Sequence, residues 1–318
     1  MRTCAALALL AATCSLAQTA SIQRRAAAPE EIRGGALMKD GTVLTWGDAL
    51  RSWTLPGLQS KVLAKGRFGE GGCLVDLDGP AFVSYEGTGL GALTIRRPPD
   101  WKPAVIDTQI ESHDCMGATL FGRKGVLMIQ RYMQVRFYEP DAHGWKSREI
   151  YSIYTPSQQT GLAIGDVDGD GRPDLFCGNY WVQSPERFDL PWHVFAIDTY
   201  FEQPLSAMLA LAPFKNSLIV AQGHLSPARV AVFDKPPDPR QLWTEKRIEG
   251  AEFHRPHALL ADDNRIFLGE NDGALSRLFE IQDSRPRELL RGLAMVALLK
   301  WKDSLIAIGP REIALLAF

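Results

Sequence analysis

Residues 166–174 read Asp-Val-Asp-Gly-Asp-Gly-Arg-Pro-Asp, which places four carboxylates at positions 1, 3, 5 and 9 of a short loop. Carboxylates this close repel one another unless a cation lies between them. Calcium takes six to eight oxygen ligands, and alternate side chains of a tightly turning loop converge on one point. Gly171 permits the sharp turn, and a backbone carbonyl at Arg172 adds an oxygen. The spacing therefore predicts a Ca²⁺ site formed by Asp166, Asp168, Asp170, Arg172 and Asp174.

The flanks of this loop distinguish it from an EF-hand. An EF-hand needs a bidentate Glu at position 12 and a helix on each side, but position 12 here is Cys177. Residues 161–165 and 175–178 are short apolar stretches that read as strands. The alternative is an acidic, solvated turn that binds no metal.

These residues carry a resemblance to a known family. The run Ala163-Ile164-Gly165, the Asp loop and the following Asp174-Leu175-Phe176 resemble one FG-GAP or VCBS repeat, the unit of integrin-alpha-like β-propellers, here of a secreted bacterial type. The resemblance covers residues 161–181. It implies a propeller blade and, for the whole protein, a role as a binding module.

Internal repeats extend the propeller prediction to the whole chain. Seven apolar first strands recur at intervals of about 40 residues, the length of a four-stranded blade. They begin near Gly35, Gly72, Met116, Gly161, Ala207, His257 and Ala294. Each is followed by a turn and a second apolar strand, and several fourth strands open at a Trp, as at Trp101, Trp145, Trp192 and Trp243. The turns at residues 76–79 and 262–264 either are ordinary turns or are former metal loops.

The last blade supplies three strands, within residues 294–299, 305–308 and 313–318. A missing fourth strand would leave an open edge of unpaired backbone groups. We therefore predict that residues 21–33 supply it and close the circle. The expected fold is an all-β, seven-bladed β-propeller that forms one domain over residues 21–318.

The N-terminus and the charge indicate the compartment and exclude some partners. Residues 1–20 combine Arg2, an apolar run and small residues, which predicts a signal peptide and a secreted or periplasmic protein. An uncleaved anchor and a lipoprotein attached at Cys14 are alternatives. The apolar run is shorter than a membrane span, and we expect no membrane insertion after cleavage. A formal net charge of −2 gives no indication of a nucleic-acid partner, and we expect a monomer.

Cys73, Cys115 and Cys177 remain after cleavage, and an odd number cannot form a complete disulfide framework. At most one pair can form. Small buried thiols on strands are the expected state for all three.

Blade topology assigns the loops to two faces. The Asp loop joins a first strand to a second strand, so we expect a structural role for its calcium. The entries to first strands and the second-to-third loops open on the other face, called here the mouth. The polar and aromatic residues expected there are the ligand-binding candidates: His113, Arg131, Asn179, Tyr180, Trp181, His224, His257, Glu270 and Asp272.

Three functions fit such a mouth, and the sequence leaves open whether the protein is an enzyme. The first is a binding module for a carbohydrate or protein ligand. The second is a polysaccharide lyase or hydrolase that uses His113, His224, His257 or Tyr180 as base, with Arg131 neutralising a uronate. The third is a catalytic metal site of His113, His224 and His257 with Glu270 nearby. We favour the binding module.

Overall fold

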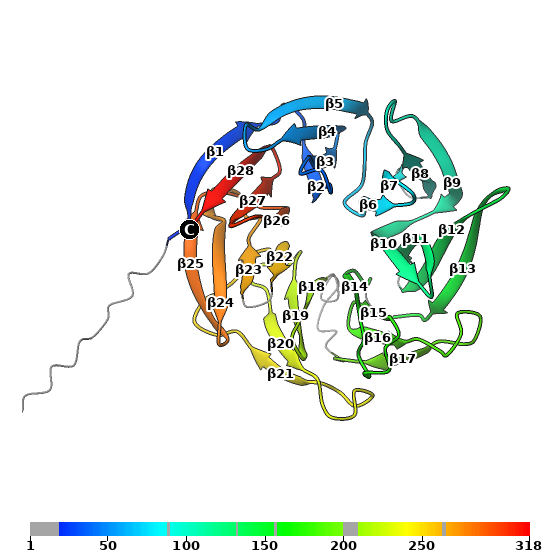
Figure 1. The fold of residues 1–318 in the computed structure, drawn as a ribbon. Coiled ribbons are helices and arrows are strands. Elements are labelled where there is room, and N and C mark those ends of the chain that lie inside the picture. Colours follow the sequence, from blue (N-terminus) through cyan, green and yellow to red (C-terminus); the bar gives the residue numbers. More distant parts are fainter. Residues whose placement is uncertain (1–18, 88–89, 132, 156–157, 200–208, 263–264) are drawn as a thin grey trace, which may run out of the picture.

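The computed structural model describes residues 19–87, 90–131, 133–155, 158–199, 209–262 and 265–318. In these residues it contains seven four-stranded antiparallel sheets arranged around a central axis (Figure 1). The sheets are the blades of a β-propeller, as predicted from the repeats. Residues 1–18, which include most of the predicted signal peptide, lie outside the described part.

The first four blades follow one another along the chain, each built from consecutive strands. Blade 1 comprises β2 (Ile32–Leu37), β3 (Val43–Gly47), β4 (Ala49–Thr54) and β5 (Gln59–Lys65). Blade 2 comprises β6 (Cys73–Asp76), β7 (Pro80–Glu86), β8 (Gly91–Arg96) and β9 (Pro103–Ile110). Blade 3 comprises β10 (Ser112–Leu120), β11 (Arg123–Gln130), β12 (Gln134–Asp141) and β13 (Gly144–Ser152). Blade 4 comprises β14 (Leu162–Gly165), β15 (Asp174–Cys177), β16 (Tyr180–Gln183) and β17 (His193–Ala196).

The remaining blades complete the circle. Blade 5 comprises β18 (Leu209–Phe214), β19 (Ser217–Gln222), β20 (Val230–Asp234) and β21 (Thr244–Arg247). Blade 6 comprises β22 (Ala258–Ala261), β23 (Ile266–Gly269), β24 (Arg277–Gln282) and β25 (Arg285–Arg291), with a short 3₁₀ turn η1 (Gly273–Leu275) before β24. Blade 7 comprises β26 (Ala297–Trp301), β27 (Ser304–Gly309), β28 (Glu312–Ala317) and the N-terminal β1 (Ser21–Ala27).

The pairing of β1 with β28 closes the propeller. The two strands are antiparallel, from Ser21 opposite Ala317 to Ala27 opposite Glu312, and they lie side by side in Figure 1. This confirms the predicted closure. The closing strand ends at Ala27, whereas Arg33 belongs to β2. Because β1 pairs with β28, the backbone groups of β28 are paired on both sides and blade 7 has four strands like the other blades.

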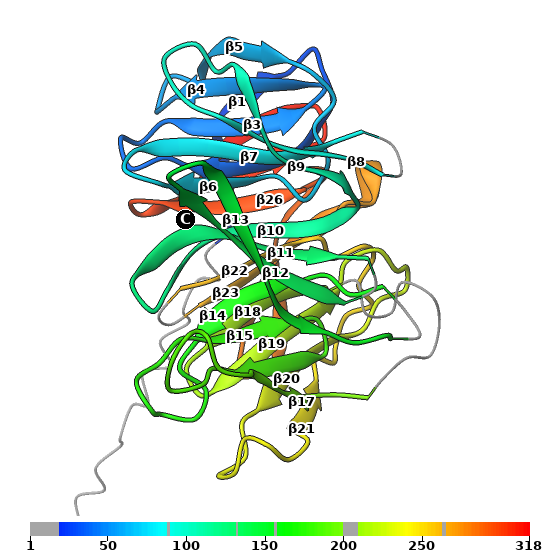
Figure 2. The ribbon, with the colours of Figure 1, turned by 90° about the vertical axis from the view of Figure 1, so that its right-hand side faces the viewer.

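The hydrophobic core is divided among the seven interfaces between neighbouring blades. Each buried cluster combines side chains from two adjacent sheets, as where Val43 and Trp53 of blade 1 meet Ile306 and Ile308 of blade 7. Figure 2 shows the propeller from its edge, with strands of blade 1 at the top and strands of blades 4 and 5 at the bottom. Burial of apolar area between sheets, at roughly 25 cal/mol per Å², is therefore what holds each blade to the next.

Tryptophans at the start of fourth strands fill these interfaces. Trp243 packs edge-on against Phe176 of the preceding blade, and its indole N–H donates to the carbonyl of Pro239. Trp192 contacts Phe121 and Phe188 in the interface of blades 3 and 4. The indole N–H of Trp192, unlike that of Trp243, is buried without a hydrogen-bond partner among the described residues. The width of both rings suits the space between diverging sheets.

The expectation that all three cysteines are thiols is wrong for two of them. Cys73 on β6 and Cys115 on β10 form a disulfide, with 5.7 Å between their Cα atoms. Both residues lie on first strands, which are neighbours in the circle although 42 residues separate them in sequence. Cys177 is buried and is a free thiol. Among the described residues, no helix is long and apolar enough to cross a membrane.

Candidate functional site

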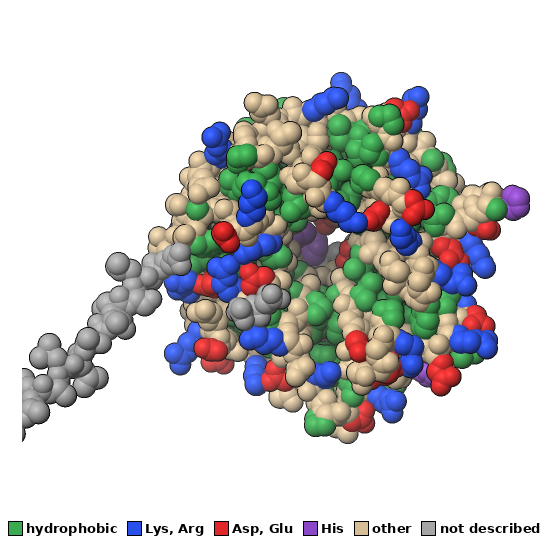
Figure 3. All heavy atoms as spheres, viewed as in Figure 1, with side chains coloured by type: hydrophobic (Ala, Val, Ile, Leu, Met, Phe, Trp, Pro, Cys, Tyr) green, Lys and Arg blue, Asp and Glu red, His purple; other side chains and the backbone are tan. Residues whose placement is uncertain are grey.

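A cavity of about 560 Å³ occupies the centre of the propeller. The first strand of every blade contributes to its wall, and Figure 3 shows the opening with histidine atoms inside it. Apolar residues such as Leu74, Leu211 and Leu298 form the middle of the wall. The charged and polar side chains lie near one end, at or just before the starts of first strands and in one loop between a second and a third strand: Arg33, Glu70, Asp114, Thr160, His224 and His257.

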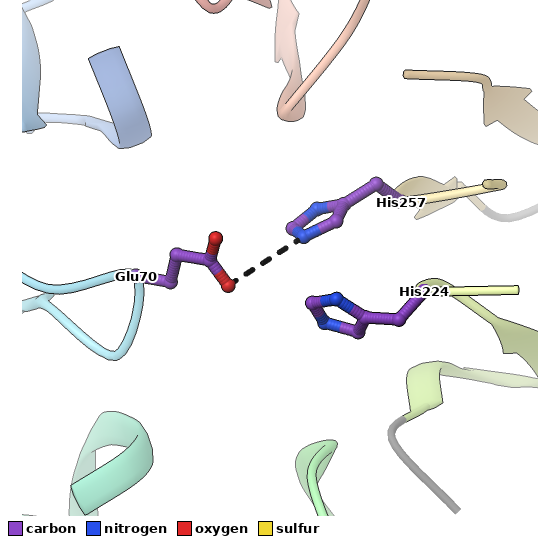
Figure 4. A group of neighbouring side chains, drawn as sticks. All are labelled: Glu70, His224 and His257. Atoms are coloured by element: carbon purple, nitrogen blue, oxygen red, sulfur yellow. Dashed lines mark ion pairs between the residues drawn. The ribbon is translucent and has the colours of Figure 1, made fainter. Parts of the chain in front are cut away.

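Three of these side chains approach one another from three blades. Glu70 precedes β6, His224 lies in the loop between β19 and β20, and His257 directly precedes β22. Figure 4 shows them pointing toward one another across the channel. One possible ligand atom from each lies within 4.8 Å of those of the other two. In an antiparallel blade, the start of the first strand and the loop between the second and third strands lie at the same end. All three residues therefore lie at the mouth.

The contacts within this group are loose. Nε2 of His257 stands 3.9 Å from a carboxylate oxygen of Glu70, which is too far for a hydrogen bond. The two imidazoles meet edge to face, with 5.2 Å between their centres. Burial and the neighbouring His257 lower the pKa of His224, although Glu70 opposes the shift. His224 is therefore held in the neutral form, with a lone pair available to a ligand.

Asp114 adds a second carboxylate to the wall. Its side chain accepts a hydrogen bond of 2.9 Å from the backbone N–H of Gly161 in the next blade. Burial raises its pKa to about 6, and hydrogen bonds from backbone N–H groups offset part of the shift. Arg33, in contrast, is occupied by Glu31 and Asp48 at 2.9 Å each. The mouth thus combines neutral imidazole, carboxylate and hydroxyl groups.

The structure places several sequence-predicted mouth residues elsewhere. Asn179 is buried and its carbonyl accepts a hydrogen bond of 2.8 Å from the N–H of Ile197. Trp181 is fully buried, stacks on Phe195 and donates to the carbonyl of Pro239. Tyr180 packs against the core between blades 3 and 4. These three side chains belong to the blades and are absent from the wall of the central cavity.

Arg131 is also separated from the histidines. It lines a different hollow, of about 300 Å³, together with Met133 and Tyr154. His113 lies on β10, but its side chain is outside the described part of the chain. Of the proposed enzyme residues, the structure therefore brings together His224 and His257.

The side chain of Glu270 is buried and bonded to neighbouring groups of blade 6. Its side chain is 0% exposed and forms an ion pair with Arg277 at 2.8 Å. The same carboxylate accepts hydrogen bonds from the backbone N–H groups of His254 and Arg277. Asp272 lies on the loop before η1, where its N–H donates to the hydroxyl of Ser276. Glu270 thus fastens the entry of blade 6 to β24, and its oxygens do not face the channel histidines.

The Asp loop joins β14 to β15, on the face opposite the mouth. Asp166, Asp168 and Asp174 each place a carboxylate oxygen within 4.8 Å of the other two. Asp166 accepts hydrogen bonds from the N–H groups of Gly169 and Gly171, both of which have positive φ. Asp170 instead pairs with the guanidinium of Arg172.

The donors of this loop fit a hard cation. Asp174 is fully buried, and burial raises its pKa to about 6 although N–H groups of Ser184 and Val167 donate to it. The carboxylate of Asp168 raises that pKa further. A cation among three carboxylates would remove this unfavourable arrangement, and oxygen-only donors suit calcium. Asp170 would have to exchange its Arg172 partner for the ion.

Glu70 is one of the mouth residues that the sequence analysis did not select; Arg33, Asp114 and Thr160 are the others. Glu70 stands in the run Gly69-Glu70-Gly71-Gly72 before the first strand of blade 2. His257 has the corresponding place before the first strand of blade 6. The rule that entries to first strands face the mouth would have selected Glu70 as well, because the repeat pattern already gave that strand's position.

The comparisons with known proteins agree with this architecture. Residues 159–185 match the family model described as FG-GAP repeat. None of the curated proteins compared matches the sequence. The chain therefore carries an FG-GAP repeat in blade 4 of a seven-bladed β-propeller.

Solved structures resemble the whole chain at low sequence identity. The β-propeller domain of Cps50 (Swd1) from Myceliophteria thermophila has a TM-score of 0.62 at 9% identity, and the match covers 94% of this chain and 99% of that one. BamB from Moraxella catarrhalis has a TM-score of 0.55 at 11% identity, covering 94% and 100%. Sqt1 from Saccharomyces cerevisiae has a TM-score of 0.53 at 10% identity, covering 88% and 82%. Identities this low support the fold and no shared function.

Proposed function

We propose that this protein is a secreted, calcium-stabilised β-propeller that acts as a binding module, and that its ligand enters the central channel at the mouth. The observation that carries the proposal is the cavity of about 560 Å³, whose polar groups gather at one end. Ligand pockets of small molecules have volumes of roughly 300–1,000 Å³ and a few convergent polar groups on an apolar wall. A rigid closed propeller keeps such groups in place without a ligand.

The ligand that this geometry favours is a carbohydrate unit. Sugars offer hydroxyl groups that donate to carboxylate oxygens and imidazole nitrogens, and Asp114, Glu70, His224 and His257 supply these acceptors. The polar groups lie inside a channel, whereas a folded protein partner would need a broad surface. A protein whose loop or terminus enters the channel is the competing ligand.

The lyase alternative is less well supported. It needs a base beside a cationic clamp for the substrate carboxylate. Arg131 and Tyr180 lie away from the cavity that His224 and His257 line, and Arg33 is already paired with two carboxylates. Binding without turnover is what the described part of the mouth supports best.

A glycan array probed with the calcium-loaded full chain tests the ligand proposal. We expect binding to one group of glycans, lost when Glu70→Ala and His257→Ala are combined and retained in His193→Ala, which removes an exposed histidine of β17. Glycan binding that is the same in all three proteins would contradict a ligand in the channel. Release of unsaturated products from acidic polysaccharides would favour the lyase.

Thermal unfolding with and without a calcium chelator tests the proposed metal. A ligand at 100 times its dissociation constant stabilises the folded state by about 2.7 kcal/mol. We expect chelation to lower the melting temperature of the wild type and to have little effect on Asp168→Asn. The matched control is Asp303→Asn in the exposed β26–β27 turn, which should respond to chelation like the wild type. A wild type that is indifferent to chelation would refute the calcium proposal.

A further inference from the structure

We propose that Glu70, His224 and His257 form a second metal site, distinct from the Asp loop, which binds a divalent transition metal of the zinc type in the central channel. The site uses three of the four side chains proposed above as ligand acceptors, but the metal is inferred from their geometry and does not depend on the carbohydrate. It rests on the convergence of two imidazoles and one carboxylate from three separate blades.

The distances are compatible with one ion held by all three side chains. Because their donor atoms lie within 4.8 Å of one another, a central point is no farther than about 2.8 Å from each. Zinc bonds to imidazole nitrogen and carboxylate oxygen measure roughly 2.0–2.2 Å. Closing the difference requires each donor to move by less than about 1 Å. Glu70 is 54% exposed and flanked by glycines, so its side chain is free to make the larger part of that movement.

The donor atoms available also indicate a metal. Nδ1 of His257 is buried and has no hydrogen-bond partner among the described residues, and its Nε2 is 3.9 Å from Glu70. The lack of a partner for the buried Nδ1 costs free energy. Nε2 has no short hydrogen bond to Glu70, so its lone pair is available to an ion.

The donor types distinguish this site from the Asp loop. Calcium and magnesium take oxygen ligands, which the Asp loop supplies. Imidazole nitrogens mixed with a carboxylate suit zinc, cobalt, nickel or copper. The two sites open on opposite faces of the propeller, so each can be loaded and tested separately.

The coordination would be incomplete. Three protein ligands leave a fourth tetrahedral position open, as in zinc sites that bind an exchangeable water or an anionic group. Glu70, His224 and His257 all line the cavity of about 560 Å³, which has room for a small carboxylate-bearing ligand beside an ion held there. A metal here would therefore give the mouth a preference for anionic ligand groups.

Isothermal titration of the full chain with Zn²⁺, in excess Ca²⁺ to fill the Asp loop, tests the site. We expect one equivalent of Zn²⁺ to bind the wild type and at least 100-fold weaker binding in His224→Ala and His257→Ala. Glu70→Gln keeps the size of the side chain and removes its charge, and it should bind at least 10-fold more weakly. Co²⁺ in place of Zn²⁺ should give the visible absorption of a four-coordinate ion.

Two control variants make the result specific. His193→Ala and His143→Ala remove exposed histidines far from the cluster in sequence and should bind Zn²⁺ as the wild type does. Circular dichroism melting in Ca²⁺ alone identifies any variant that fails to fold, and Glu70→Gln, on an exposed loop, provides a test if a histidine variant does. Absence of stoichiometric Zn²⁺ binding to the wild type, or equal affinity in the cluster and control variants, would overturn the proposal.

Discussion

Reduction of the Cys73–Cys115 disulfide should lower the free energy of unfolding by about 4 kcal/mol. The bridge spans 42 residues of sequence, and the chain-entropy relation for a loop of this length gives about 4 kcal/mol at 25 °C. The bridge joins the first strands of blades 2 and 3, so it also resists the separation of two blades next to the channel. A loss of about 4 kcal/mol is a large fraction of the free energy of unfolding, which is roughly 5–15 kcal/mol for folded domains.

Equilibrium unfolding in urea measures the effect. The wild type should unfold at a lower urea concentration after reduction, and a variant combining Cys73→Ala with Cys115→Ala should unfold at a similarly low concentration whether or not reductant is present. Cys177→Ala is the matched control, because Cys177 is a buried free thiol of blade 4. It should keep the full response to reductant.

Two results would refute this reasoning. One is a wild-type midpoint that reductant does not change, since an entropic cross-link must then be missing or without effect. The other is a thiol titration of the denatured chain covering residues 19–318 that finds three reactive thiols before reduction. The structure requires one, from Cys177, before reduction and three after it.

Two further predictions concern buried charges. Glu270→Ala leaves Arg277 without its carboxylate partner. It should lower the free energy of unfolding, measured in urea, by about 3–5 kcal/mol. A loss below about 1 kcal/mol would show that the pair does not stabilise the fold. Burial raises the pKa of the Asp114 carboxyl group from 3.8 to about 6. The folded state therefore binds the carboxyl proton more tightly than the unfolded state does. The free energy of unfolding should fall as the pH rises from about 4 to 6. The decrease in the free energy of unfolding due to Asp114 is at most about 3 kcal/mol. If Asp114→Asn and the wild type had the same dependence of stability on pH, the prediction would be contradicted.

The geometry of the mouth shows why a rigid propeller can carry more than one site. Each first strand begins at the same face, so residues before β6 and β22 meet although most of the chain separates Glu70 from His257. The Asp loop lies on the other face because it joins a first strand to a second. A change at one site should therefore have little effect on the other, apart from overall stability.

Local patterns in the sequence determined the fold. Apolar strands at intervals of about 40 residues, turns between them and an incomplete last blade predicted seven blades closed by the N-terminus, because strand alternation and edge pairing depend on short-range chemistry. The spacing of Asp166, Asp168 and Asp174 likewise predicted three carboxylates that do converge. Tertiary structure alone decided which side chains from different blades meet. Glu270 turns inward because Arg277 lies beside it, Cys73 reaches Cys115 because their strands are neighbours, and Glu70 joins His224 and His257 because the circle brings distant loops together.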